Sequence, residues 1–193
     1  GAAGELGRGL CSALAKAGAN LLLVDIKEPD NRYLKHLTHE GVEVEFMTID
    51  ITKPDAACTI INRCLERFGQ LDILVNSAGI VALDPAEEVT EQDWDKTIAV
   101  NLKGVFLTSQ QAGKHFIKQG HGKIVNLASQ AGVVALPNHL AYCTSKAGVI
   151  GMTKVLALEW GPLGVQINAI SPTVVLTELG RKAWSGQVAE DMK

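Results

Sequence analysis

The hydrophobic residues of this chain alternate between a helical and a strand period from end to end. Residues 5–17 predict an amphipathic helix that ends at Gly18. Its apolar face holds Leu6, Leu10, Leu14 and Ala17. Residues 20–26 predict instead a strand that is apolar on both faces, as in buried parallel sheets. This alternation limits the fold more than any other feature, because helices alternating with doubly buried strands build layered α/β structures.

The same alternation continues along the rest of the chain. Further helices are predicted over residues 31–40, from Pro54 to about Phe68, from the N-cap Thr90 to about Gln119, and over 140–159. Further strands are predicted over residues 42–48, 71–75, 123–128 and 165–171. We therefore predict one doubly wound, Rossmann-type α/β domain over residues 1–193, with a parallel sheet flanked by helices and right-handed crossovers.

One element of that pattern is missing. A glycine loop that opens a helix normally follows a strand, yet here the loop begins at Gly1. At the other end, Lys193 falls inside a predicted helix. We expect that the first strand and a C-terminal part lie outside this sequence.

Composition excludes several classes of protein. The chain is 47% hydrophobic and 20% charged over 193 residues, which is typical of one globular domain and not of a disordered chain. A net charge of −3 without a basic stripe argues against nucleic acid as a partner. No apolar run approaches the roughly 18 residues of a membrane span. The cysteines have no metal-site spacing, so we expect no metal and reduced thiols in the cytoplasm: Cys11, Cys58, Cys64 and Cys143.

Four glycines gather just before and within the first helix: Gly1, Gly4, Gly7 and Gly9. Glycines there let the backbone approach a pyrophosphate, and the helix N-terminus supplies N–H donors and a positive dipole. Asp25 ends the next strand. A carboxylate at that position binds both hydroxyls of the adenosine ribose and repels a 2′-phosphate, so the expected cofactor is NAD and not NADP.

Tyr142 and Lys146 are four residues apart in a predicted helix, so both lie on one face. An ammonium group beside a phenol is expected to lower the phenol pKa from about 10, which allows proton exchange near neutral pH. Such a pair also occurs by chance on solvated helices. Ser129 strengthens the catalytic interpretation, because it ends a buried strand, where open α/β sheets place their sites.

Together these segments resemble the short-chain dehydrogenase/reductase family over nearly the whole chain. Residues 1–7 (GAAGELG) resemble its T-G-x-x-x-G-x-G loop, although the threonine is absent and Glu5 replaces the middle glycine. Three further segments resemble its D-[VI]-T, N-N-A-G and N-L-x-G motifs: Asp50-Ile51-Thr52, Asn76-Ser77-Ala78-Gly79 and Asn101-Leu102-Lys103-Gly104.

The resemblance implies roles for these residues. Ser129 binds the reacting oxygen, Tyr142 acts as general acid or base, Lys146 also binds the nicotinamide ribose, and Asn101 holds a water in a proton relay. The implied NAD contacts are Gly1, Gly4, Glu5, Leu6, Gly7, Asp25, Asp50, Ile51, Asn76, Ala78, Gly79, Tyr142, Lys146, Pro172, Thr173, Val174, Val175 and Thr177. Family members are usually dimers or tetramers built on the helices at about 91–119 and 140–160.

The substrate expectation also comes from resemblance. Ser129-Gln130, Asn138-His139 and Pro172-Thr173 resemble the xylulose reductase and polyol dehydrogenase branch. We expect a polyol of the threitol, arabinitol or xylitol type to be oxidised to a ketose, with Ser129, Gln130, His139, Tyr142 and Trp184 at the substrate. Gln130 and His139 are equally compatible with solvated loop positions, and Trp184 with ordinary helix packing.

Two other functions stay open. A 3-oxoacyl or sugar-acid (gluconate-type) reductase would share Ser129, Tyr142 and Lys146 and differ only in the pocket. A non-catalytic dinucleotide-binding protein is less expected, because both Tyr142 and Lys146 are present. The sequence does not indicate which hydroxyl reacts or the physiological direction.

Overall fold

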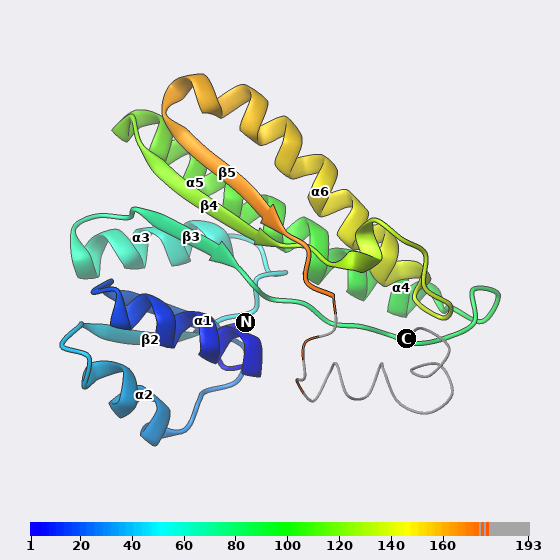
Figure 1. Cartoon of the computed structure of the whole chain (residues 1–193), viewed down its shortest axis with the longest axis horizontal. Helices are drawn as coiled ribbons and strands as arrows, with labels where there is room; N and C mark the ends of the chain where they lie inside the picture. Colours follow the sequence, from blue (N-terminus) through cyan, green and yellow to red (C-terminus); the bar gives the residue numbers. More distant parts are fainter. Residues whose placement is uncertain (174, 176, 178–193) are drawn as a thin grey trace.

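The computed structural model describes residues 1–173, 175 and 177, and it shows parallel strands flanked by helices (Figure 1). The strands are β1 (Leu21–Asp25), β2 (Val44–Thr48), β3 (Ile73–Asn76), β4 (Gly122–Leu127) and β5 (Val165–Ile170). The α-helices are α1 (Glu5–Lys16), α2 (Asn31–Thr38), α3 (Ala56–Phe68), α4 (Glu91–Ile98), α5 (Val105–Gln119) and α6 (Leu140–Trp160). Shorter helical segments are η1 (Ala99–Gly104), η2 (Gln130–Gly132) and η3 (Gly161–Leu163).

The described strands form two parallel sheets and not the one continuous sheet that we predicted. β1 pairs with β2, with Leu21 opposite Val44, and β3–β4–β5 form the second sheet, with Ile73 opposite Lys123. The sheets are separate because no described strand lies between β1 and β3. The predicted fold class, parallel strands with flanking helices, is confirmed.

Each sheet has its own apolar core. In the larger core, residues of α3, α5 and α6 pack on the three-stranded sheet around Phe116 and Ile124, both fully buried. In the smaller core, α1 and α2 pack on β1 around Leu23 and Leu37. The predicted packing of helices on parallel strands therefore holds, but the expected burial on both faces does not: in β1 only Leu21 and Leu23 are buried, and in β3 only Asn76.

The helix predicted from Thr90 to Gln119 is not one regular α-helix. Thr90 does cap it, since its hydroxyl accepts a 3.1 Å hydrogen bond from the Asp93 N–H. The middle, however, is the π-helical segment η1, which separates α4 from α5 and contains Asn101. Gly104 ends this segment against Ile51: a Cβ there would lie 2.7 Å from Ile51 Cδ1, so a larger residue would require the Ile51 side chain to move. Such π-helical turns recur at functional sites.

Several predicted boundaries were wrong by about two residues, including those at α3 and β3. Pro54 does not begin α3; it lies in a turn, and the helix begins at Ala56 after Asp55, whose φ of 60° is left-handed. The strand predicted over residues 71–75 lies instead at Ile73–Asn76, which places Asn76 inside β3.

Candidate active site

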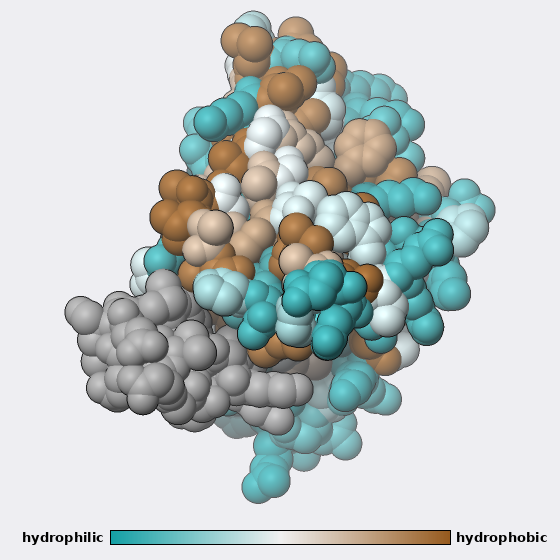
Figure 2. Space-filling model, turned by 90° about the vertical axis from the view of Figure 1, so that its right-hand side faces the viewer, coloured by the Kyte–Doolittle hydropathy of each residue, from teal (hydrophilic) through white to brown (hydrophobic). Residues whose placement is uncertain are grey.

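A cavity of about 700 Å³ lies at the carboxyl ends of the strands. Figure 2 views the molecule from this side, where apolar surface alternates with hydrophilic surface. Val133 and Val134, which follow η2, and Leu140, which begins α6, are exposed. The cavity is lined by every described candidate residue except Asn76 and Asn101. Val174 and Trp184, also predicted for the site, lie outside the described residues.

The structure brings Ser129, Tyr142 and Lys146 together on one side of this cavity. Ser129 follows β4 and caps η2, accepting a 3.1 Å hydrogen bond from the Ala131 N–H. Tyr142 and Lys146 belong to the first turns of α6, with the lysine Nζ 5.7 Å from the centre of the phenol ring. This separation allows the ammonium group to act on the phenol electrostatically.

The protonation of this pair differs from our prediction. Burial raises the pKa of Tyr142 above its ordinary value, and the hydrogen bond with the Ser129 side chain opposes this only in part. Burial also lowers the pKa of Lys146 to about 8. We had predicted a lowered phenol pKa; the desolvation of both groups instead favours their neutral forms.

Asn101 lies beside the cavity without lining it, and its side chain is fully buried. Its Nδ2 donates to the Ile80 carbonyl (2.8 Å) and to Ser145 Oγ (3.2 Å), and its Oδ1 accepts from the Ile80 N–H (2.8 Å). Ser145 Oγ in turn donates to the Tyr142 carbonyl at 2.7 Å. Asn101 therefore joins the loop after β3 to the start of α6. No motif in the sequence indicates Ser145 or Ile80; the one available signal is that Ser145 directly precedes Lys146.

The glycine loop is packed so tightly that side chains are excluded at two positions. A Cβ on Gly7 would lie 2.0 Å from the Gly1 carbonyl oxygen, and one on Gly1 would lie 2.6 Å from the Ala78 nitrogen. Gly4 is the N-cap of α1 and provides no side-chain cap, so the first N–H groups of the helix are left for another acceptor. Glu5 starts the helix and lines the cavity. At Gly4 a Cβ would make only an ordinary van der Waals contact, so the packing does not require glycine at that position.

Asp25 ends β1 and lines the cavity. Its carboxylate accepts hydrogen bonds from the Ala3 N–H (3.0 Å) and the Lys27 N–H (3.1 Å), and it lies 3.5 Å from the amino group of Gly1. Burial acts to raise the pKa of Asp25, but the N–H donors of Ala3, Lys27 and Ile26 act against it, and the pKa lies below its ordinary value. The residue is therefore a carboxylate near neutral pH.

The Asp50-Ile51-Thr52 segment follows β2 as a fixed turn. Asp50 Oδ1 accepts hydrogen bonds from the Thr52 N–H (2.9 Å) and from Thr52 Oγ1 (2.7 Å), which lower the pKa of Asp50. All three residues line the cavity. Lys96 of α4 also lines it, a residue that no motif in the sequence had indicated.

Asn76, predicted to contact NAD, lies in a buried polar network below the cavity. Its Nδ2 donates to Ser109 Oγ (3.0 Å) and Asn126 Oδ1 (2.9 Å), and its Oδ1 accepts from Thr108 Oγ1 (2.8 Å). Asn126 continues the network to Thr153 Oγ1 (3.0 Å). This differs from our prediction because the side chain turns into the core from β3; it orients the strand that leads to Ala78 and Gly79.

The segment after β5 runs beside the segment after β4. The Pro172 carbonyl accepts a 2.9 Å hydrogen bond from the Gln130 N–H, and the Ile170 carbonyl accepts one of 2.8 Å from the Ala128 N–H. Pro172 and Thr173 therefore line the cavity next to Ser129. Within the described ranges, no group of three or more His, Cys, Asp or Glu side chains is arranged to hold a metal ion.

A family model described as "short chain dehydrogenase" matches residues 1–188 of this sequence. The chain belongs to the short-chain dehydrogenase family. It is 46% identical over 193 residues to the NAD-dependent glycerol dehydrogenase of Listeria innocua, covering 100% of this chain and 75% of the relative. It is also 46% identical over 194 residues to the D-threitol dehydrogenase of Mycolicibacterium smegmatis, with the same coverage.

A solved structure has the same fold. NAD+-bound xylitol dehydrogenase superimposes with a TM-score of 0.87 at 30% identity, over 99% of this chain and 80% of the solved one. The family assignment made from the motifs is thus confirmed. Among the described helices, none is both long enough and apolar enough to cross a bilayer.

Proposed function

We propose that this short-chain dehydrogenase oxidises a secondary hydroxyl of a small polyol, of the threitol, arabinitol or xylitol type, to a ketone with NAD, and that residues 1–193 act as one catalytic domain. One observation carries the proposal. A single cavity holds Ser129, Tyr142 and Lys146 together with the Asp25 carboxylate. Relatives whose names state NAD-dependent glycerol and D-threitol oxidation support both the cofactor and the substrate class.

The described residues fit NAD. The crowded glycines bring the backbone close at Gly1 and Gly7, and the uncapped N-terminus of α1 offers N–H donors to a pyrophosphate. The Asp25 carboxylate suits a ribose diol and repels a 2′-phosphate. When bound, NAD supplies the nicotinamide carbon that accepts a hydride from the substrate carbon.

The protein's own part is to position the hydroxyl and remove its proton. Ser129 Oγ holds the reacting oxygen, and Tyr142 Oη takes its proton as general base. The charged form of Lys146, which is populated below its pKa of about 8, counteracts the burial that raises the Tyr142 pKa and stabilises the phenolate that accepts this proton. Asn101 holds the loop after β3 against α6, and we place its relay water between this loop and Lys146.

Gln130 and His139 line the cavity beside Tyr142 and suit a substrate with several hydroxyls. His139 Nδ1 lies 2.6 Å from the Pro137 carbonyl, and a carbonyl can only accept, so Nδ1 carries the proton. Nε2 is then left as an acceptor for a substrate hydroxyl. The His139 ring packs edge-on against Tyr142, with 6.2 Å between ring centres. His139 is therefore a direct neighbour of the residue proposed to accept the substrate proton. Trp184 completes the proposed substrate set.

We also infer a homo-oligomer, a dimer or tetramer, in the cytoplasm. Apolar side chains are exposed on the two long helices, namely Phe106 on α5 and Val155 and Leu158 on α6, and a second copy would cover them. The cysteines in the described part of the chain are free thiols, which agrees with a reducing compartment.

An activity screen tests the function. The protein is assayed with NAD and, separately, NADP against threitol, arabinitol, xylitol and gluconate, following absorbance of the reduced cofactor. We expect turnover of at least one polyol, and a higher kcat/KM with NAD. Activity confined to gluconate or a 3-oxoacyl substrate would support the reductase alternative, and bound NAD without any turnover would support a non-catalytic binding protein.

A further inference from the structure

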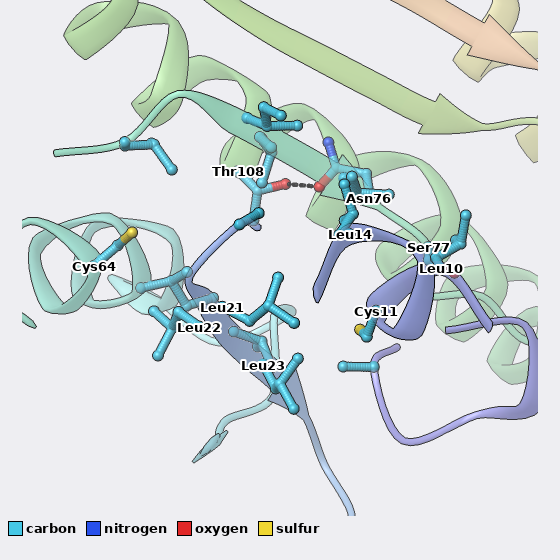
Figure 3. Close-up of a pocket in the computed structure, with 18 of the residues that line it drawn as sticks. Leu10, Cys11, Leu14, Leu21, Leu22, Leu23, Cys64, Asn76, Ser77 and Thr108 are labelled. Atoms are coloured by element: carbon cyan, nitrogen blue, oxygen red, sulfur yellow. Dashed lines mark hydrogen bonds between the residues drawn. The ribbon is translucent and has the colours of Figure 1, made fainter. Parts of the chain in front are cut away.

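The helix α1 has an apolar face and a face that carries Arg8. Leu10 and Leu14 line a second cavity, of about 380 Å³, between β1 and β3, and both are labelled in the close-up together with Cys11 (Figure 3). Arg8 lies nearly opposite Leu10, because each residue turns a helix by about 100°. It lines neither this cavity nor the active-site cavity. Any effect of Arg8 on the active site therefore passes through the residues that it binds.

Arg8 holds the glycine loop by a main-chain oxygen. Its Nε donates a 2.9 Å hydrogen bond to the Ala3 carbonyl. The N–H of the same residue, Ala3, donates a 3.0 Å hydrogen bond to Asp25 Oδ2. Because both backbone polar groups of Ala3 are engaged, the peptide groups on either side of it have fixed orientations. Only Ala3 therefore separates Arg8 from the carboxylate proposed to bind the ribose.

The same guanidinium group binds the segment that leads from β1 to α2. Its Nη1 donates a 3.0 Å hydrogen bond to Asp30 Oδ2, and Asp30 Oδ1 caps α2 by accepting from the Tyr33 N–H at 2.9 Å. The Arg8 Cζ lies 4.6 Å from the centre of the Tyr33 ring, and this side chain is buried. A cation over an aromatic face is attracted to it, so the ring helps to fix the guanidinium plane.

These contacts close a ring around Asp25. From Asp25 the ring passes through Ala3, Arg8 and Asp30 and returns along residues 26–29 of the main chain. A lysine would not close it, because two donors must point in different directions from one rigid group, as in a planar guanidinium. The Arg8 and Asp30 side chains are 35% and 52% exposed, and exposed ion pairs stabilise proteins little. The main effect of the ring is therefore on geometry and not on stability.

We propose that Arg8 is a positioning residue for cofactor selection, which holds the Ala3 N–H on the Asp25 carboxylate. Fixed in this way, the carboxylate keeps the orientation in which it accepts from the ribose hydroxyls and opposes a 2′-phosphate. The inference rests on the proposed use of NAD. Because Asp30 neutralises the Arg8 charge, the guanidinium does not offset the repulsion of a 2′-phosphate by Asp25.

Two substitutions of Arg8 in the 193-residue chain separate positioning from charge. Arg8→Met keeps an apolar stem of similar reach and removes every donor. Arg8→Lys keeps the positive charge but does not make both hydrogen bonds at once. Calorimetric titration gives the Kd for NAD and for NADP, and NMR gives the rate at which the Ala3 amide exchanges with water in the absence of cofactor.

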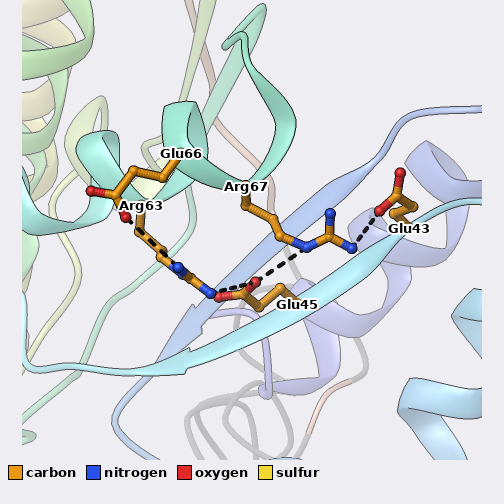
Figure 4. A network of polar contacts seen from close by, with 5 residues as sticks. All are labelled: Glu43, Glu45, Arg63, Glu66 and Arg67. Atoms are coloured by element: carbon orange, nitrogen blue, oxygen red, sulfur yellow. Dashed lines mark hydrogen bonds and ion pairs between the residues drawn. The ribbon is translucent and has the colours of Figure 1, made fainter.

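The matched control is Arg63→Met, in a network that ties α3 to β2 (Figure 4). Arg63 donates to both carboxylate oxygens of Glu45, from Nε at 2.5 Å and from Nη2 at 3.0 Å. Its side chain is 42% exposed, close to the value for Arg8, and it lines neither cavity. The control therefore removes an ion pair of the same kind without touching the ring around Asp25. The network also contains Glu43, Glu66 and Arg67.

Both Arg8 variants should exchange the Ala3 amide faster and bind NAD about three- to tenfold more weakly, since the carboxylate is no longer held in place. The ratio of the NADP Kd to the NAD Kd should shrink by at least about threefold, because the repulsion of a 2′-phosphate weakens as well. Arg63→Met should lower Tm slightly and leave the Ala3 exchange rate and the Kd ratio unchanged.

Three results would overturn the inference. One is an unchanged exchange rate of the Ala3 amide in Arg8→Met. Another is a wild-type Kd ratio in Arg8→Lys, which would assign the effect to charge alone. The third is a ratio that grows because NADP binds more weakly, which would make Arg8 itself a ligand for the 2′-phosphate. If the unmodified chain binds neither dinucleotide, the proposed function fails instead, and the Ala3 exchange rate alone decides whether Arg8 positions this loop.

Discussion

The Nζ of Lys146 donates a 2.6 Å hydrogen bond to the main-chain carbonyl of Leu127. This contact ties α6 to the end of β4, directly before the segment that carries Ser129. It also explains how a lysine with only 4% of its surface exposed is held in place. Burial of the ammonium group is the cause of its lowered pKa.

Lys146 should make stability rise with pH. Burial lowers its pKa from 10.5 to about 8, so the charged form is disfavoured in the folded state. The cost of burying the charged lysine therefore lowers the free energy of unfolding by its full amount below pH 8. This cost disappears as the pH rises through 10.5, where the lysine of the unfolded chain also loses its proton. Relative to Lys146→Met, the free energy of unfolding should rise by up to about 3 kcal/mol across this interval. Urea denaturation at several pH values measures this; a constant difference between the two proteins would contradict it.

Gly7→Ala should abolish NAD binding and destabilise the protein, because the new Cβ would lie 2.0 Å from the Gly1 carbonyl oxygen. Gly9→Ala is the matched control. Gly9 has open space around it and lies inside α1, so alanine there should leave binding intact and stabilise by about 0.5–1 kcal/mol. Calorimetric titration with NAD and thermal unfolding compare the two variants. Similar behaviour of the pair would show that the loop is not sterically constrained.

Asp25→Asn should weaken NAD binding about tenfold or more, because a charged acceptor for the ribose hydroxyls is lost. The preference for NAD over NADP should shrink as well, since the variant no longer repels a 2′-phosphate. Glu28→Gln removes a nearby exposed carboxylate that lines neither cavity and should change neither quantity. The Kd values for both dinucleotides provide the measurement. An unaltered NAD/NADP ratio in Asp25→Asn would remove Asp25 from cofactor selection.

Much of the fold could be predicted because burial imposes its period on the sequence. Runs such as residues 20–26 are apolar on both faces only when helices cover both sides, so the parallel strands were recognisable. The π-helical segment at Ala99–Gly104 was not, because it is a single short turn, and a break in the helical period over so few residues gives no recognisable sequence pattern. Likewise Pro54 is compatible with a first helical turn, and only the left-handed Asp55 shows that the helix starts later.

The site was predicted where a motif fixes the backbone and less well where a side chain can turn either way. The position of Ser129 at a strand end and the four-residue spacing of Tyr142 and Lys146 predicted that these side chains lie together, and all three line one cavity. Asn76 and Asn101 carry the expected identities but point into buried networks, a choice made by tertiary partners such as Ser109 and Ile80. The phenol pKa was predicted from the lysine charge alone, whereas the burial that opposes it depends on the whole fold.

The central claim is that Tyr142 moves the proton of the reacting alcohol, and Tyr142→Phe tests it most directly. The substitution keeps the ring that packs against His139 and removes only the phenol oxygen. With NAD and the best polyol, kcat should fall by about 10²–10⁴-fold while the Kd for NAD stays within about twofold. A variant that retains most of its turnover with unchanged NAD affinity would contradict this account.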